Sequence, residues 1–91
     1  MTDGRHYVYM LKCSDGTFYM GYSTELARRV REHNESTKGA KYTRGRRPVE
    51  LVYYVECESR SAALKCEHTL RKKSRAEKEK LVEAFEGNLD F

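Results

Sequence analysis

Glu67 is the carboxylate in this sequence whose position most needs a chemical explanation. If the surrounding residues form a helix, its neighbours at spacings of three and four are Ala63, Leu64, Leu70 and Arg71. A carboxylate against an apolar surface costs free energy unless something neutralises it. An ion pair with Arg71 would do so, and so would a hard cation such as Mg²⁺, which needs only one or two protein oxygens. The spacing alone leaves both interpretations open.

A second feature with chemical meaning is the basic segment 38–47, KGAKYTRGRR. It contains five cations, no acid and one aromatic residue, Tyr42. Because glycines interrupt it and a predicted helix precedes it, we expect a flexible cationic loop that suits a polyanion such as nucleic acid. The shorter cluster RKKSR at 71–75 is more typical of a solvated surface.

These residues need a scaffold, which the hydrophobic pattern predicts. Alternation and a high content of tyrosine and valine predict three strands, at 6–12, 17–22 and 49–55. Capping residues and helical spacing predict three helices, from Ser23 or Thr24 to about Asn34, over 59–73, and from Ser74 to about Phe85, with a polar loop at 35–48. Arg29 and His33, four residues apart, share one strip of the first helix. The order β-β-α-β-α-α predicts an α+β fold, a three-stranded, at least partly antiparallel sheet flanked by helices.

The turn between the first two strands decides which tyrosines share a face of the sheet. Ser14-Asp15-Gly16 fits a three-residue loop that Gly16 closes in the left-handed region, and a two-residue Asp-Gly turn is the alternative. In the three-residue loop Tyr9 lies opposite Gly21, and Tyr9 and Tyr19 point to the same face. Gly21 would then leave space beside the two phenols where a phosphate can approach the backbone. The two-residue turn would place the two tyrosines on opposite faces.

The whole chain sets limits on the class of protein. It has 91 residues, a net charge of +4 and a pI of about 9.0, with 38% hydrophobic and 35% charged residues. We expect one domain over 1–91, with a core at about 6–85 and a frayed tail at 86–91. No apolar run approaches the roughly 18 residues of a membrane span, and the start, MTDGRHYVY, has no signal segment, so we expect a cytoplasmic protein. Three cysteines without a C-x-x-C pair are expected to be reduced thiols.

Several ordered motifs together resemble a known family. YVYMLKCSDGTFYMGYSTELARRVREHN, KGAKYTRGRRPVELVY and the SRSAALKCE helix are similar to the GIY-YIG nuclease superfamily, and most of all to its small single-domain bacterial branch. The resemblance covers about residues 6 to 80 and implies a three-stranded antiparallel sheet between helices. The chain departs from the family pattern at Tyr7, where the family name has glycine, and at Tyr22, where repair-type members often have lysine. An asparagine found late in some homing-type members has no clear match.

The resemblance also implies roles for individual residues. It assigns catalysis to five positions, with Tyr19 as the general base and Glu67 as the ligand of Mg²⁺ or Mn²⁺: Tyr9, Tyr19, Arg29, His33 and Glu67. Arg29 and the metal would favour the phenolate form of Tyr19, and Arg29 would also donate hydrogen bonds to the phosphate. The residues expected to contact nucleic acid are those of the basic segment, Lys41, Tyr42, Thr43, Arg44, Arg46 and Arg47. Gly16 and Gly21 are expected to serve the turn and a close approach to the backbone.

These assignments predict a metal-dependent endonuclease that hydrolyses DNA phosphodiester bonds. We expect low sequence specificity, with selection of DNA structure in repair or recombination as one option, no membrane association, and room for a protein partner. A nucleic-acid-binding module with little or no turnover is the main alternative. An interaction domain that docks through the last helix or through Tyr53 and Tyr54 is the third.

Overall fold

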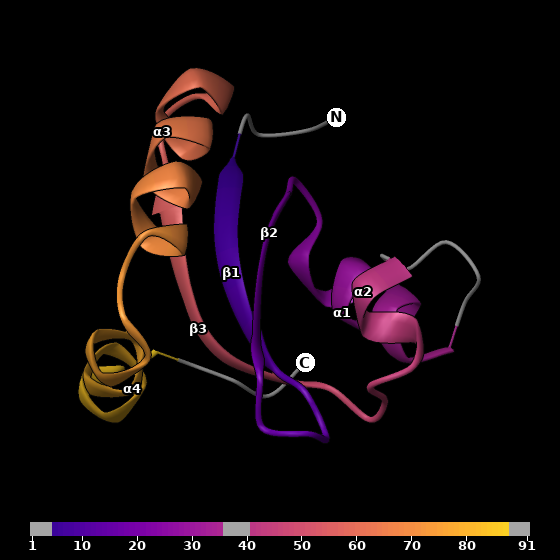
Figure 1. The fold of residues 1–91 in the computed structure, drawn as a ribbon. Coiled ribbons are helices and arrows are strands. Elements are labelled where there is room, and N and C mark those ends of the chain that lie inside the picture. Colours follow the sequence, from indigo (N-terminus) through magenta and orange to yellow (C-terminus); the bar gives the residue numbers. More distant parts are fainter. Residues whose placement is uncertain (1–4, 36–40, 88–91) are drawn as a thin grey trace.

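The computed structural model describes residues 5–35 and 41–87 and contains one antiparallel sheet (Figure 1). Strand β1, His6–Lys12, lies in the centre, between β2, Phe18–Ser23, and β3, Glu50–Cys57. The helices are α1, Leu26–Glu35, α2, Lys41–Arg44, α3, Arg60–Arg71, and α4, Arg75–Ala84. The predicted α+β fold and its order are therefore confirmed, with α2 as an addition. Parts of the predicted basic segment, at 38–40, and of the predicted tail, at 88–91, lie outside the described residues.

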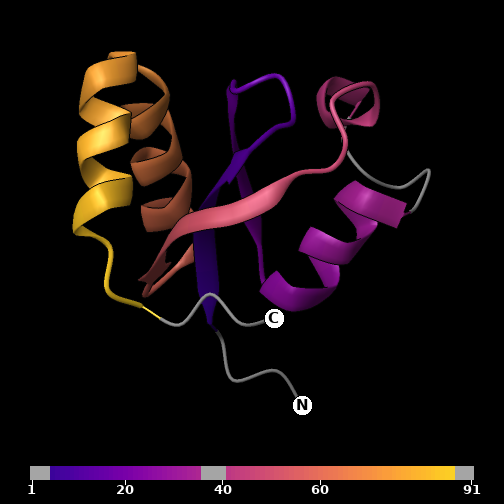
Figure 2. The same ribbon diagram turned by 90° about the horizontal axis from the view of Figure 1, so that it is seen from below.

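The helices form layers on both sides of the sheet. Helices α3 and α4 lie on one side, and α1 and α2 lie on the other (Figure 2). Each face has its own core, because side chains alternate along a strand. One core gathers Val8, Met10, Met20, Val52, Ala63 and Leu70, against which α3 and α4 pack. The other gathers Tyr9, Leu11, Cys13, Leu26, Val49 and Leu51 beside α1.

The hairpin between β1 and β2 has the three-residue loop that the sequence favours. The Cys13 amide donates to the Thr17 carbonyl at 2.8 Å, and Gly16 has a φ of 84°. A residue with a side chain reaches that region only at a cost, which glycine avoids. The resulting register pairs Tyr9 with Gly21 and Leu11 with Tyr19. Both tyrosines therefore point to the α1 side of the sheet, and Tyr22 to the other side.

The tip of this hairpin is held from both sides. On the α2 side, the Arg46 side chain pairs with Asp15 at 3.0 Å, and the Ser14 amide donates to the Arg46 carbonyl at 2.9 Å. On the α4 side, Arg75 donates to the Gly16 carbonyl at 2.8 Å. Two residues more than 25 positions away in the sequence thus fix a loop of three residues.

Helix α2 is the element that the sequence did not predict. We expected an irregular loop over 35–48, and within it the structure has one helical turn at Lys41–Arg44. A four-residue helix has no apolar periodicity that a sequence could reveal. Its Thr43 is fully buried, so the segment is packed against the rest of the fold and the expected flexible loop is wrong for residues 41–47.

Candidate active site

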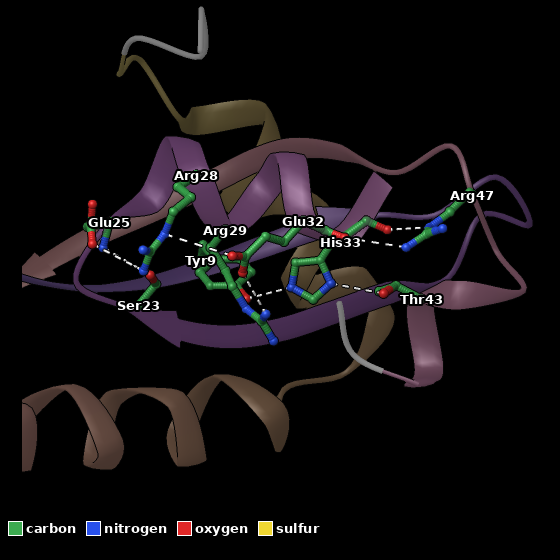
Figure 3. A network of polar contacts seen from close by, with 9 residues as sticks. All are labelled: Tyr9, Ser23, Glu25, Arg28, Arg29, Glu32, His33, Thr43 and Arg47. Atoms are coloured by element: carbon green, nitrogen blue, oxygen red, sulfur yellow. Dashed lines mark hydrogen bonds and ion pairs between the residues drawn. The ribbon is translucent and has the colours of Figure 1, made fainter. Parts of the chain in front are cut away.

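Three buried polar side chains form a chain of hydrogen bonds beneath α1 (Figure 3). The Tyr9 hydroxyl lies 2.7 Å from Nε2 of His33, and Nδ1 of His33 lies 2.9 Å from Oγ1 of Thr43. These residues come from β1, α1 and α2, and each is at most 1% exposed. Buried polar groups are stable only when paired, so the three side chains hold one another in place.

Arg29 sets the direction of the protons in this chain. Its guanidinium hydrogen-bonds to the Tyr9 hydroxyl, and a guanidinium can only donate. The Tyr9 oxygen therefore accepts from Arg29, and its own proton points to Nε2 of His33. The network assigns the remaining ring proton to Nδ1, which donates to Thr43.

The ionisation of both rings follows from this burial. Burial, with smaller contributions from Arg29 and Arg47, lowers the pKa of His33 from 6.5 to about 4, so the imidazole is neutral at neutral pH. Burial raises the pKa of Tyr9 to about 12, although Arg29 acts in the opposite direction. Tyr9 therefore remains a neutral phenol and is a poor general base near pH 7.

The neutral imidazole predicts a specific pH dependence of stability. Because the pKa of His33 is lower in the folded state, the unfolded chain binds this proton more readily. The contribution of His33 to the free energy of unfolding is fully present above about pH 6.5 and is lost as the pH falls through 4. It corresponds to about 3 kcal/mol of unfolding free energy. Urea unfolding should show that the free energy of unfolding falls much less between pH 7.5 and pH 4.5 in His33→Gln than in the wild type.

His68 provides the matched control for this measurement, because it is exposed on α3. Other groups also titrate in this range, and the comparison between variants removes their contribution. His68→Gln should keep the pH dependence of the wild type. Equal slopes for the wild type and His33→Gln would contradict the buried neutral imidazole.

Tyr19 lies beside the same imidazole, as the hairpin register requires. Its ring centroid is 5.2 Å from that of His33, with an angle of 60° between the planes. The ring of Tyr42 stacks on it at 5.7 Å and 26°. Within residues 5–35 and 41–87, no group hydrogen-bonds to the Tyr19 hydroxyl. The two phenols therefore differ: that of Tyr9 is buried and bonded, and that of Tyr19 is half-buried and available.

Arg29 is placed at the site by α1. A salt bridge with Glu32, one turn along the helix, fixes its guanidinium at 3.0 Å. Both side chains are about a quarter exposed, so the guanidinium is within reach of a ligand from solvent. The α1 carbonyls of Glu32 and His33 accept from Arg47, and the side chain of Asn34 bonds to both backbone groups of Val49. These contacts fix the end of α1 against the start of β3.

Glu67 comes from the opposite side of the sheet. It lies on α3, which packs against β1 and β2, and its side chain is 12% exposed. Its carboxylate pairs with Arg71, the simpler of the two arrangements that the sequence left open. Its charge makes a small contribution to the raised pKa of Tyr9, whose ring lies on the α1 side of the sheet. In the described part of the chain no three His, Cys, Asp or Glu side chains form a metal cluster, so any metal there would depend on few protein oxygens.

Four residues of the basic segment are committed to contacts inside the protein. Thr43 is buried against His33, which excludes the direct contact with nucleic acid that we expected. Arg47 binds the end of α1, and Arg46 binds Asp15 and the Tyr42 carbonyl.

Tyr42 has Tyr19 on one side, and the Arg46 guanidinium lies 4.0 Å from its ring centroid. Stacking of a base on this ring would have to displace one of them, so the expectation of a ring free for a base is wrong. Lys41 and Arg44 are exposed.

Gly21 also has a different role from the one expected. The space opposite Tyr9 is filled by the Tyr9 ring itself, which lies against the Gly21 backbone. A phosphate cannot occupy that space while the ring is there. The group that closely approaches the Gly21 backbone is therefore the Tyr9 ring, and the predicted space for a phosphate at this position is wrong.

Comparison with known proteins supports a common origin for this arrangement. The sequence model of the GIY-YIG catalytic domain matches residues 5–80, which include every element from β1 to the first half of α4. The chain is a member of the GIY-YIG family.

Relatives of this GIY-YIG chain occur in archaea and bacteria. A UPF0213 protein of Natronomonas pharaonis is 56% identical over 77 residues, which cover 85% of this chain and 89% of the relative. The solution structure of a UPF0213 protein from Bacillus halodurans shares 47% identity and a TM-score of 0.55, covering 87% of this chain and 83% of that one. The solution structure of the protein EF2693 from E. faecalis shares 45% identity and a TM-score of 0.61, over 92% and 91% of the two chains. The fold of the GIY-YIG chain is thus also observed in experimental structures.

The family places the chain among nuclease catalytic domains, which act on nucleic acid. Of the five residues assigned to catalysis, Tyr9, Tyr19, Arg29 and His33 meet on one face of the GIY-YIG sheet. Sequence reasoning assigned Thr43 the wrong role and passed over Glu32. A threonine in a basic segment gives no signal of burial, whereas the spacing of Arg29 and Glu32 at i and i+3 could have indicated their salt bridge. None of the helices in the described ranges has the length and apolarity required to cross a bilayer.

Proposed function

We propose that this chain is a metal-dependent endonuclease that hydrolyses DNA phosphodiester bonds with low sequence specificity. The observation that carries the proposal is the convergence of the two phenols, the guanidinium of Arg29 and the imidazole of His33, in a chain of the GIY-YIG family. These groups come from β1, β2 and α1, so convergence required the fold. Selection of DNA structure in repair or recombination, and a cytoplasmic location, belong to the same proposal.

The structure supports a division of labour between the two tyrosines. Hydrolysis requires a water to lose a proton while it attacks phosphorus and the bond to the leaving oxygen breaks. Tyr19 suits the role of proton acceptor, because its hydroxyl is available and Arg29 supplies positive charge to the same site. Tyr9 suits positioning, because its oxygen accepts from Arg29 and its proton points to His33.

Arg29 is the group that would bind the scissile phosphate. Its side chain is 26% exposed, and its planar donors match two non-bridging phosphate oxygens. Charge on these oxygens grows in the transition state, so the hydrogen bonds strengthen as the reaction proceeds. Neutral His33 holds Tyr9, and through it the guanidinium, in the geometry this requires.

Glu67 is the residue that would hold Mg²⁺ or Mn²⁺. Its carboxylate is a hard oxygen donor in a largely buried position, and Mg²⁺ needs one or two such ligands besides water. Arg71 now neutralises this carboxylate and is itself 58% exposed, so it can turn away when a cation binds. The metal would supply Lewis-acid stabilisation of the leaving 3′ oxygen.

The test is a cleavage assay on labelled single-stranded, duplex and branched DNA with Mg²⁺ or Mn²⁺. We expect products from the wild type and a loss on the order of 10²–10⁴-fold for Tyr19→Phe, which removes only the acceptor oxygen. Tyr53→Phe is the matched control, since Tyr53 packs on the other face of the sheet. No cleavage of any substrate, or equal rates for Tyr19→Phe and the wild type, would refute the proposal. Equal losses in the two variants would do the same.

A nucleic-acid-binding module with little turnover remains the second candidate, because it needs the same cationic surface. Binding that weakens with salt, without products, would support it. The docking surface considered at Tyr53 and Tyr54 is partly covered, since both rings contact Phe85 at 5.4 and 5.1 Å.

A further inference from the structure

We propose that α2 is the positioning element of the site, with Tyr42 holding the ring of Tyr19 and Thr43 holding the imidazole of His33. This inference rests on the proposed nuclease function. Two consecutive residues, on an element of four, contact the two rings that the mechanism needs. The family resemblance assigned neither residue to catalysis.

Tyr19 depends on packing for its orientation, and the described residues that hold its ring are the core on the α1 side and its aromatic neighbours. In the part of the chain that the structure describes, its hydroxyl makes no hydrogen bond. The phenol can therefore swing about two side-chain bonds unless neighbours hold both sides. The plane of the His33 ring makes an angle of 60° with that of Tyr19. The Tyr42 ring makes an angle of 26° with it and stacks on its face. Offset stacking of this kind fixes a ring in direction as well as position.

Tyr42 can hold another ring because it is itself held. The Arg46 guanidinium lies 4.0 Å from its ring centroid and donates to its carbonyl at 2.8 Å. Arg46 is anchored in turn by Asp15 in the hairpin loop at 3.0 Å. The contacts from Tyr19 through Tyr42 and Arg46 to Asp15 therefore begin on β2 and end in the loop that precedes β2, so both ends lie on the same hairpin.

Thr43 holds the imidazole of His33 in place, as Tyr42 holds the ring of Tyr19. Its hydroxyl is the acceptor for Nδ1–H, and the side chain is fully buried. The Arg29–Tyr9 end of the chain places the proton on Nδ1, and the bond to Thr43 gives this Nδ1–H a buried acceptor while Nε2 faces Tyr9. A contact of this kind fixes the orientation of the imidazole ring, and with it the position of the nitrogen to which Tyr9 bonds.

The competing role for Tyr42 is direct stacking on a nucleobase. The ring is 38% exposed, so a base could reach its edge, although its faces are covered. The two roles differ in the kinetic constant that they affect. A positioning residue changes kcat, whereas a contact to nucleic acid changes KM and the Kd for DNA.

The experiment compares Tyr42→Ala with Tyr42→Phe. We expect Tyr42→Ala to lower kcat on the order of 10- to 100-fold with little change in KM, as a misplaced reacting group does, and Tyr42→Phe to recover most of that loss. Added to Tyr19→Phe, Tyr42→Ala should cause no further loss, because it acts through Tyr19. A raised KM with kcat unchanged, or full activity of Tyr42→Ala, would overturn the inference. Tyr42→Leu serves in the same assays if the alanine variant does not fold.

Two NMR measurements separate this inference from the proposed function, because they need no cleavage. The Tyr19 ring protons should lose their ring-current shift in Tyr42→Ala and keep it in Tyr42→Phe. The ¹⁵N shift of His33 Nδ1 should be similar in the wild type and in Thr43→Ser, and should change in Thr43→Val, where Nδ1–H loses its acceptor. Unchanged spectra in Tyr42→Ala and Thr43→Val would refute the positioning role even in an active nuclease. The expected spectra in a protein that cuts nothing would refute only the nuclease.

Discussion

Replacing Glu67 by glutamine is expected to abolish metal-dependent cleavage, with a loss of at least about 10³-fold. Lewis-acid stabilisation of a leaving oxygen is worth several kcal/mol, and about 4 kcal/mol corresponds to this factor. Glutamine has nearly the same size as glutamate, so the packing of α3 is retained. The ion pair with Arg71 is lost, but the arginine is 58% exposed and is solvated without it, and the neutral amide leaves no unpaired charge buried. The fold and the affinity for DNA should therefore change little.

Glu79 offers a closely matched control for this prediction. It forms an ion pair with Arg75 four residues away, as Glu67 does with Arg71, but on the exposed surface of α4. Cleavage rates should be measured over a titration of Mg²⁺ or Mn²⁺. They should be far lower for Glu67→Gln than for the wild type, and Glu79→Gln should have the rates of the wild type. Binding of DNA measured by fluorescence anisotropy without metal should be similar for all three proteins. Retained cleavage in Glu67→Gln would remove the metal-binding role of this carboxylate.

Gly21→Ala is expected to destabilise the protein and to disrupt the site at the same time. A methyl group at position 21 would overlap the hydroxyl and ring of Tyr9. Tyr9 is 1% exposed and bonded to His33 at 2.7 Å, so it cannot move aside without breaking buried contacts. Overpacking costs about 1–3 kcal/mol, and an unpaired buried group costs about as much again. The expected total is about 2–6 kcal/mol of unfolding free energy, together with loss of cleavage.

Urea unfolding provides the measurement, and Gly45→Ala provides the control. Nothing lies within 4 Å of a methyl group placed at Gly45, so that variant should be at least as stable as the wild type. Both substitutions restrict the unfolded chain in the same way, and the difference between them isolates the overlap with Tyr9. If Gly21→Ala and Gly45→Ala unfold at the same urea concentration, the packing of Tyr9 against this glycine is not rigid.

The sheet and its two faces could be predicted because local chemistry determines them. Asp15 and Gly16 select the loop, the loop selects the register, and the register places Tyr9 and Tyr19 on one face. The capping box at Ser74 and Glu77 likewise begins α4 where the sequence indicated. Helical spacing placed Arg29 and His33 on one strip of α1, and the family resemblance assigned them to the site.

The role of the basic segment could not be predicted, because it depends on contacts between distant parts of the chain. Charge and glycine content suggested a solvated loop around Tyr42, Thr43 and Arg46. In the structure Thr43 is buried against His33 of α1. Arg46 forms a salt bridge with Asp15, which lies 31 positions away in the sequence. Composition describes what a segment carries, and only tertiary structure shows whether those groups face solvent.

The anchoring of the hairpin tip by Arg46 and Arg75 has a consequence for how this fold can vary. Tips of hairpins usually tolerate added residues, since they project into solvent. Here one extra residue after Ser14 would strain two long-range anchors and turn Tyr19 toward α3. Evolution of new substrate preferences in this lineage is therefore expected to leave this turn at constant length and to proceed through insertions elsewhere.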